Sequence, residues 1–120
     1  MSANFETAVN YFQQSRFDRC LKTCRKVIGA DPRFVDAYLL GAQAAQARGQ
    51  SQQAEKFLLQ AAKVCPDSLV VQRNLGVLKS QLGQIEEADR AFRKALMIDP
   101  KDAETLYCFA VHLDSNHQSK

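Results

Sequence analysis

The residue types that most often carry chemistry stand in no catalytic or metal-binding pattern along this 120-residue chain. Its four cysteines are Cys20, Cys24, Cys65 and Cys108. Cys20 and Cys24 would share one helix face, but no second Cys/His pair follows at zinc spacing, so we interpret all four as reduced, buried residues of a cytoplasmic protein. His112 and His117 form no constellation with a serine, a cysteine or an acid pair, and His112 is expected at the surface or at a helix edge. We therefore expect no enzyme activity, no metal and no cofactor.

The charged residues include one basic run, in which Asp18 is the only acid. Its members are Arg16, Arg19, Lys22, Arg25 and Lys26. This run predicts a solvated helix face or, alternatively, a surface for an acidic partner or an anionic surface. The formal net charge of +3 is too small to indicate nucleic acid. The longest apolar runs are too short for membrane insertion, and the first ten residues lack the basic region of a secretion signal.

Three prolines reveal an internal repeat. Pro32, Pro66 and Pro100 stand 34 residues apart. Small residues recur at the same interval: Ala8, Ala42, Gly76 and Ala110 form one series, and Cys20, Ala54 and Ala88 form another. Small residues at fixed positions let two antiparallel helices approach closely, while a large neighbour fills the remaining space. The pattern therefore predicts a series of helical hairpins.

These positions resemble the tetratricopeptide repeat family, whose repeat is a helix–turn–helix of 34 residues. The segment 69–102 matches best, through Leu75, Gly76, Gly83, Ala88, Phe92, Ala95 and Pro100. It departs at Gln72 and Lys79, where the family prefers aromatic residues. The resemblance implies an all-α fold, an α-solenoid of three such repeats plus a C-terminal capping helix. The expected organisation is a degenerate repeat at 1–34, repeats at 35–68 and 69–102, a capping helix at 103–114 and a polar tail at 115–120.

The expected helices span 3–14, 17–29, 35–48, 51–64, 69–82, 85–97 and 103–114. Gly49 and Gly83 are expected to adopt the left-handed conformation between paired helices. Asp67, Ser68 and Asp102 are expected to offer oxygens to the free amides at the start of the helices that follow them. The last helix is expected to cover the third hairpin. Its apolar face is predicted to comprise Leu106, Phe109, Ala110 and Leu113.

The resemblance also implies a concave groove lined by the first helix of each hairpin. The groove residues carried over from the family are Phe5, Val9, Leu39, Gln43, Val70, Arg73, Asn74, Val77, Tyr107 and Val111. Arg73 and Asn74 are the expected polar anchors in an otherwise apolar strip. The family's clamp for a C-terminal carboxylate is not evident, because its positions hold Phe5, Val9, Leu40, Val70 and Asn74. We therefore do not expect recognition of an acidic chaperone tail.

The sequence thus predicts a non-catalytic protein–protein interaction module, acting as an adaptor, scaffold or assembly chaperone. Its partner would be an extended segment or a helix held in the groove. Phe5, Val9 and Leu39 could instead pack within or between hairpins and leave the groove small. Two further alternatives stay open: an N-terminal module of a larger multidomain enzyme, and a homo-oligomeric scaffold in which Phe5, Phe12 and Phe17 pair across a two-fold axis.

Overall fold

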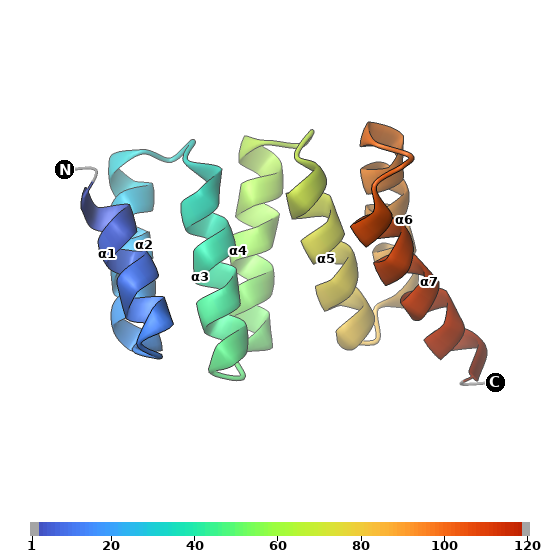
Figure 1. Cartoon of the computed structure of the whole chain (residues 1–120), viewed down its shortest axis with the longest axis horizontal. Coiled ribbons are helices and arrows are strands. Elements are labelled where there is room, and N and C mark those ends of the chain that lie inside the picture. The colour runs from blue at the N-terminus through green and yellow to red at the C-terminus, as the bar shows by residue number, and fades with distance from the viewer. Residues whose placement is uncertain (1–2, 119–120) are drawn as a thin grey trace. The chain divides into compact units, whose positions relative to one another are not determined.

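The computed structural model describes residues 3–118, which form seven helices and no strand (Figure 1). The helices are α1 (Ala3–Gln13), α2 (Phe17–Ala30), α3 (Val35–Ala47), α4 (Ser51–Val64), α5 (Leu69–Gln81), α6 (Ile85–Ile98) and α7 (Ala103–Gln118). The boundaries expected for the first six differ from these by at most one residue. α7 continues to Gln118, so residues 115–118 of the expected polar tail are helical. Residues 119–120 of that tail lie outside the described range.

The turns inside the hairpins share one backbone conformation. Gly49 and Gly83 have φ values of 75° and 79°, which confirms the left-handed turns expected there. Ser15 precedes Gly49 by one repeat and also has a positive φ, 61°. A residue with a Cβ atom adopts this conformation at a cost of about 1–2 kcal/mol. The degenerate first repeat therefore keeps the turn geometry without the glycine.

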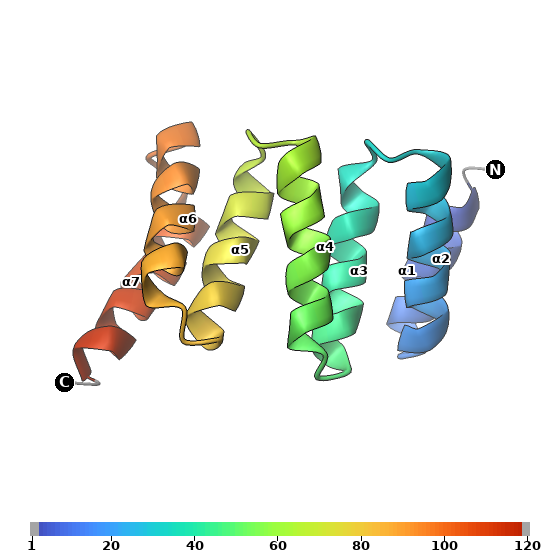
Figure 2. The ribbon, with the colours of Figure 1, turned by 180° about the vertical axis from the view of Figure 1, so that it is seen from behind.

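The helices gather into two compact units, Met1–Cys65 and Pro66–Lys120, which we call the N-terminal and C-terminal units. In the N-terminal unit, α1 packs on α2 and α3 on α4, and α2 also contacts α3. Figure 1 shows α1 and α3 on one face of this unit, and Figure 2 shows α2 and α4 on the other. In the C-terminal unit, α5 pairs with α6, and α7 packs against both.

The core of the N-terminal unit is built from small apolar residues. Cys20 and Cys24 are completely buried, as predicted, and burial raises the pKa of Cys24 to about 12. Cys65 and Cys108 are only half-buried, so the prediction of a buried position is wrong for these two. Phe57 lies against Gly41 so closely that a Cβ atom there would come within 2.8 Å of its ring. The small residues thus permit the close helix packing that the repeat predicts.

The C-terminal unit repeats this packing but buries polar side chains as well. A Cβ atom at Gly76 would lie 2.7 Å from the Phe92 ring, and Phe92 is fully buried. The buried polar or charged residues of the described chain are Gln72, Lys79, Thr105 and His112, all in this unit. Among residues 4–116, every buried side-chain nitrogen or oxygen has a hydrogen-bond partner. The polar groups therefore fit the core because each is satisfied.

Gln72 and Lys79 stand where the family pattern has aromatic residues, and each has a different kind of polar partner. Tyr38 donates a hydrogen bond from its hydroxyl to the carbonyl of Pro32, at 2.8 Å. One repeat later, the Gln72 side chain donates to the carbonyl of Pro66, at 3.4 Å, and so links the same two positions. Lys79 instead places its Nζ 2.7 Å from Glu87 Oε1, on the second helix of the hairpin.

Candidate functional site

The N-terminus of α7 is fixed by Asp102, as the sequence predicts. Asp102 Oδ2 accepts hydrogen bonds from the backbone amide of Thr105, at 2.9 Å, and from its hydroxyl, at 2.6 Å. These two bonds, and after them the charge of Arg73, hold the pKa of the Asp102 carboxyl below its ordinary value. Ser68 caps α5 in the same way, since its hydroxyl accepts from the Val71 amide at 3.3 Å. α5 and α7 therefore each begin next to a residue whose side chain caps the helix.

His112 is a buried polar residue that the sequence analysis placed wrongly. It is 2% exposed, so the expectation of a surface or helix-edge position is wrong. Its Nδ1 lies 2.6 Å from Ser80 Oγ on α5, and its Nε2 lies 2.7 Å from Asp89 Oδ1 on α6. The ring also packs on Phe92, with centroids 5.5 Å apart. His112 thus bonds α7 to both helices of the preceding hairpin.

The Ser80–His112–Asp89 arrangement contains the side chains of a catalytic triad, but its setting favours a structural role. Ser80 lies inside α5, whose backbone amides are engaged in helical hydrogen bonds. An acyl-transfer site needs donors directed at the developing oxyanion, and helical amides do not supply them. Asn116, one turn after His112, also approaches its Nε2, at 3.2 Å. We interpret the network as the fastening that sets the position of α7.

The buried face of α7 differs from the predicted one. Phe109 belongs to both, because its ring stacks on Phe92 with centroids 5.2 Å apart. Thr105 and His112 complete the buried face, whereas Leu106 and Leu113 are 45% and 38% exposed. Ala110 is exposed too. The predicted face is the one that earlier repeats turn toward their own second helix, and no second helix follows α7 within the described residues.

A pocket of about 380 Å³ opens between α5 and α7 in the C-terminal unit. Its lining residues are Val77, Ser80, Gln81, Phe92, Tyr107, Cys108, Val111, His112 and Ser115. Three of them, Val77, Tyr107 and Val111, belong to the predicted groove. Tyr107 is 71% exposed and Val111 46% exposed, so the pocket rim is apolar and open to solvent. We call this feature the α5–α7 pocket.

The other groove residues predicted in this unit lie on the same helix, α5. Val70 is exposed, and Asn74 is half-buried. Arg73 is engaged by acids at the start of α7: its guanidinium lies 3.4 Å from Asp102 and 3.6 Å from Glu104. The predicted anchor Arg73 therefore also helps to hold α7.

The N-terminal unit places its four predicted groove residues on α1 and α3. Gln43 is exposed, whereas Phe5, Val9 and Leu39 are half-buried. The Phe5 ring meets Phe34 edge-on, with centroids 4.9 Å apart. The alternative of packing between hairpins therefore describes Phe5 well.

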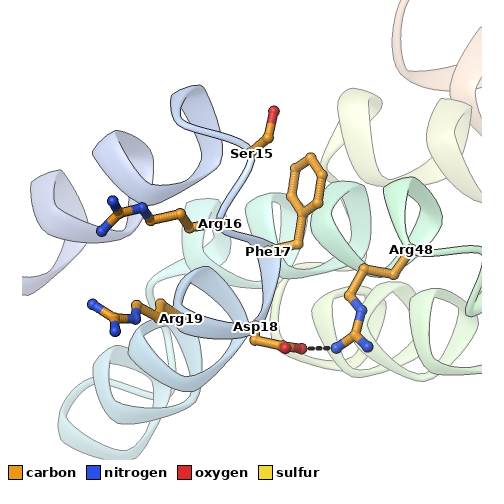
Figure 3. Close-up of a pocket in the computed structure, with 6 residues that line it drawn as sticks. All are labelled: Ser15, Arg16, Phe17, Asp18, Arg19 and Arg48. Atoms are coloured by element: carbon orange, nitrogen blue, oxygen red, sulfur yellow. Dashed lines mark ion pairs between the residues drawn. The ribbon is translucent and has the colours of Figure 1, made fainter.

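A second pocket, of about 440 Å³, lies in the N-terminal unit at the basic run. It is lined by Ser15, Arg16, Phe17, Asp18, Arg19 and Arg48 (Figure 3). Arg48 pairs with Asp18, and Figure 3 shows Arg16 and Arg19 pointing away from Arg48. The guanidinium groups do not converge on one point, so this pocket is not arranged as an anion site.

The described part of the chain has neither a cluster of metal-ligating side chains nor a membrane-spanning helix. Among residues 4–116, no three His, Cys, Asp or Glu side chains are grouped to hold a metal ion. None of the helices there is long and apolar enough to cross a bilayer. The α5–α7 pocket is therefore the feature on which a functional argument can rest.

Comparison with known proteins finds a family match over part of the chain. A family model described as a tetratricopeptide repeat matches residues 74–102. Among curated proteins, the chain has no match. The first tetratricopeptide domain of Spaghetti (RPAP3), bound to the HSP90 peptide SRMEEVD, superposes with a TM-score of 0.86 and 19% identity, covering 96% of this chain and 91% of that one.

Two further solved structures have similar scores. The second tetratricopeptide domain of human RPAP3, in complex with the HSP70 peptide SGPTIEEVD, gives a TM-score of 0.82 at 18% identity, covering 91% of each chain. The Sgt2 domain from Aspergillus fumigatus gives 0.88 at 12% identity, covering 98% of this chain and 80% of that one. At these identities the similarity establishes the helical-repeat fold.

Proposed function

Because residues 74–102 match a tetratricopeptide repeat model and the chain has the fold of such domains, we propose that it is a non-catalytic module that binds a protein or peptide partner. The finer proposal is an adaptor, scaffold or assembly chaperone that acts in the cytoplasm. Its free cysteines suit a reducing compartment. Two of the structurally similar domains were solved with bound chaperone peptides, which supports peptide binding as the general mode.

The observation that carries the proposal is the α5–α7 pocket. Val77, Tyr107 and Val111 leave apolar surface exposed around a hollow, and exposed apolar surface of this kind marks binding sites. The hydrogen bonds of His112 to Ser80 and Asp89 fix the two walls before a ligand arrives. A wall that is ordered in advance lowers the entropic cost of binding.

The chemistry of the pocket favours a partner segment anchored by apolar side chains. The peptides bound by the two RPAP3 domains end in Glu-Glu-Val-Asp. In this chain the clamp positions hold apolar residues such as Val70, and Arg73 already faces Asp102 and Glu104. We therefore propose an apolar anchor residue seated against Val77 and Tyr107, with Asn74 bonding the backbone of the ligand.

The remaining proposed contacts come from the family resemblance. They are Phe5, Val9, Leu39 and Gln43 in the N-terminal unit, and Val70 and Arg73 in the C-terminal unit. Gln43 is the most accessible of the first four, because the other three are half-buried. We expect Gln43 to contribute most among them.

The test uses peptides selected from a displayed random library against the wild-type chain. Binding of the selected peptides should fall at least about tenfold when Val77→Glu and Val111→Glu are combined, because charges would enter the apolar wall. Leu59→Glu is the matched control, since Leu59 is also apolar and 42% exposed but lies on α4. Peptides that bind the double variant as tightly as the wild type would refute the proposed site.

A further inference from the structure

The exposed apolar residues of the C-terminal unit form a second surface, distinct from the α5–α7 pocket. Leu106, Ala110 and Leu113 lie along one side of α7, and we call them the α7 strip. Their counterparts in the two preceding repeats are all buried: Tyr38, Ala42 and Ala45 in one, and Gln72, Gly76 and Lys79 in the other. In each of those hairpins an antiparallel second helix contacts the first. The internal repeat thus indicates that an antiparallel helix covers such a strip.

We propose that a second copy of this chain supplies that helix, through its own α7. The strip is self-complementary, because Leu106 and Leu113 lie at equal distances from a midpoint between Phe109 and Ala110. In an antiparallel pair, Leu106 faces Leu113 of the second copy, and Leu113 faces Leu106. Ala110 lies beside the two-fold axis, where its small side chain lets the helices approach closely.

The charges around the strip agree with this pairing. Within residues 103–118, α7 carries Glu104 and Asp114 but neither lysine nor arginine. In the antiparallel register these acids lie level with Ser115 and Thr105 of the second copy, so acids do not face acids. Arg93 of α6 borders the strip, since its guanidinium lies 5.7 Å from the centre of the Phe109 ring. It would meet the acidic α7 of the second copy, which adds a favourable charge interaction.

The first repeat is a poorer place for self-association. Phe12 and Phe17 pack on each other, with centroids 5.4 Å apart, and Phe5 packs on Phe34. The aromatic residues that the sequence suggested for a two-fold contact are therefore used within the N-terminal unit. Most of the strongly exposed large apolar residues lie instead between Met97 and Leu113.

Sedimentation equilibrium of the whole chain from about 10 µM to about 1 mM tests the dimer, because a strip of this size predicts a weak, transient association. We expect a monomer–dimer equilibrium in the wild type, weakened at least about tenfold by Leu106→Glu or by Leu113→Glu. Tyr107→Glu is the matched control on the neighbouring face of α7, and it should leave association unchanged. Circular dichroism verifies that each variant keeps its helices. A wild type that stays monomeric throughout, or an equal loss in Tyr107→Glu, overturns the proposal.

The register is tested by isotope-filtered NOEs between a ¹³C-labelled and an unlabelled copy. Contacts from Leu106 methyl groups to Leu113 methyl groups of the other copy are expected. Leu106-to-Leu106 contacts would contradict the antiparallel arrangement. The outcome is independent of peptide binding, because Tyr107 and Val111 belong to the pocket and Leu106 and Leu113 to the strip.

Discussion

The two units of this protein use the same hairpin but fill it differently. In the N-terminal unit the buried positions are apolar and mostly small, as at Ala42, Ala45 and Ala54. In the C-terminal unit the equivalents of Tyr38 and Ala45 are Gln72 and Lys79, and His112 is buried where the N-terminal unit has Ala44. The repeat geometry therefore does not demand an apolar core. It demands that every buried polar group find a partner on a neighbouring helix.

This difference has a consequence for function. Apolar contacts tolerate small displacements, whereas a hydrogen-bonded network fixes distance and angle. His112, Thr105 and Lys79 therefore define the positions of α5, α6 and α7 more narrowly than apolar contacts alone would. The α5–α7 pocket lies in the unit that has this network. We therefore infer that polar packing holds α5 and α7, the walls of the proposed binding site, in position.

The largest expected effect is the loss of stability when either of the two phenylalanines that pack on a glycine is removed. Phe57→Ala and Phe92→Ala should each lower the free energy of unfolding by about 3–5 kcal/mol, because both rings are buried. Only Phe92 also stacks on Phe109 of α7. Urea unfolding measures the loss, and amide hydrogen exchange should show faster opening of α7 in Phe92→Ala alone. Equal exchange of α7 in the two variants would break the comparison.

The next effect concerns the histidine. His112→Leu copies Leu78, the buried residue one repeat earlier, but leaves Ser80 and Asp89 without their partner. We expect a loss of about 1–3 kcal/mol in the free energy of unfolding, measured by urea denaturation. Ala44→Leu, at the equivalent position of the N-terminal unit, tests crowding alone. A His112→Leu variant at least as stable as the wild type would show that the polar network is dispensable.

A smaller effect is the difference in stability between variants that remove one or the other partner of the Lys79–Glu87 pair. The Lys79 side chain is 10% exposed and that of Glu87 is 50% exposed. Lys79→Met leaves a carboxylate that water can solvate, so stability should change little. Glu87→Gln leaves an ammonium group buried beside a neutral partner, so it should destabilise more. Thermal unfolding of the two variants side by side gives the order, and the reverse order would contradict this description of the core.

The smallest effect is a dependence on acid. Lys79 lowers the pKa of Glu87 below its ordinary value, and Thr105 followed by Arg73 lowers that of Asp102. A carboxyl with a lowered folded-state pKa stabilises the fold above its ordinary pKa, and this stability is lost as the pH falls through the folded value. Both groups lie in the C-terminal unit. NMR spectra from about pH 5 to about pH 3 should therefore show the C-terminal unit loosening before the N-terminal unit. The loosening between these pH values should be smaller in Asp102→Asn than in the wild type.

The sequence predicted the hairpins because their signals are local. Prolines, small residues and glycines recur at 34-residue spacing, and even Ser15 takes the glycine conformation. The face of α7 was mispredicted because its apolar residues match the side that a following helix would cover. His112 was missed because its partners, Ser80 and Asp89, are 32 and 23 residues away in sequence. Residue spacing along one helix contains no information on such contacts.

The central claim is that the α5–α7 pocket holds a peptide partner, and chemical-shift mapping of a selected peptide tests it most directly. We expect the largest shifts at Val77, Tyr107 and Val111, with smaller changes along α5 and the start of α7. Shifts confined to the basic run of α2, or to Leu106 and Leu113, would contradict it.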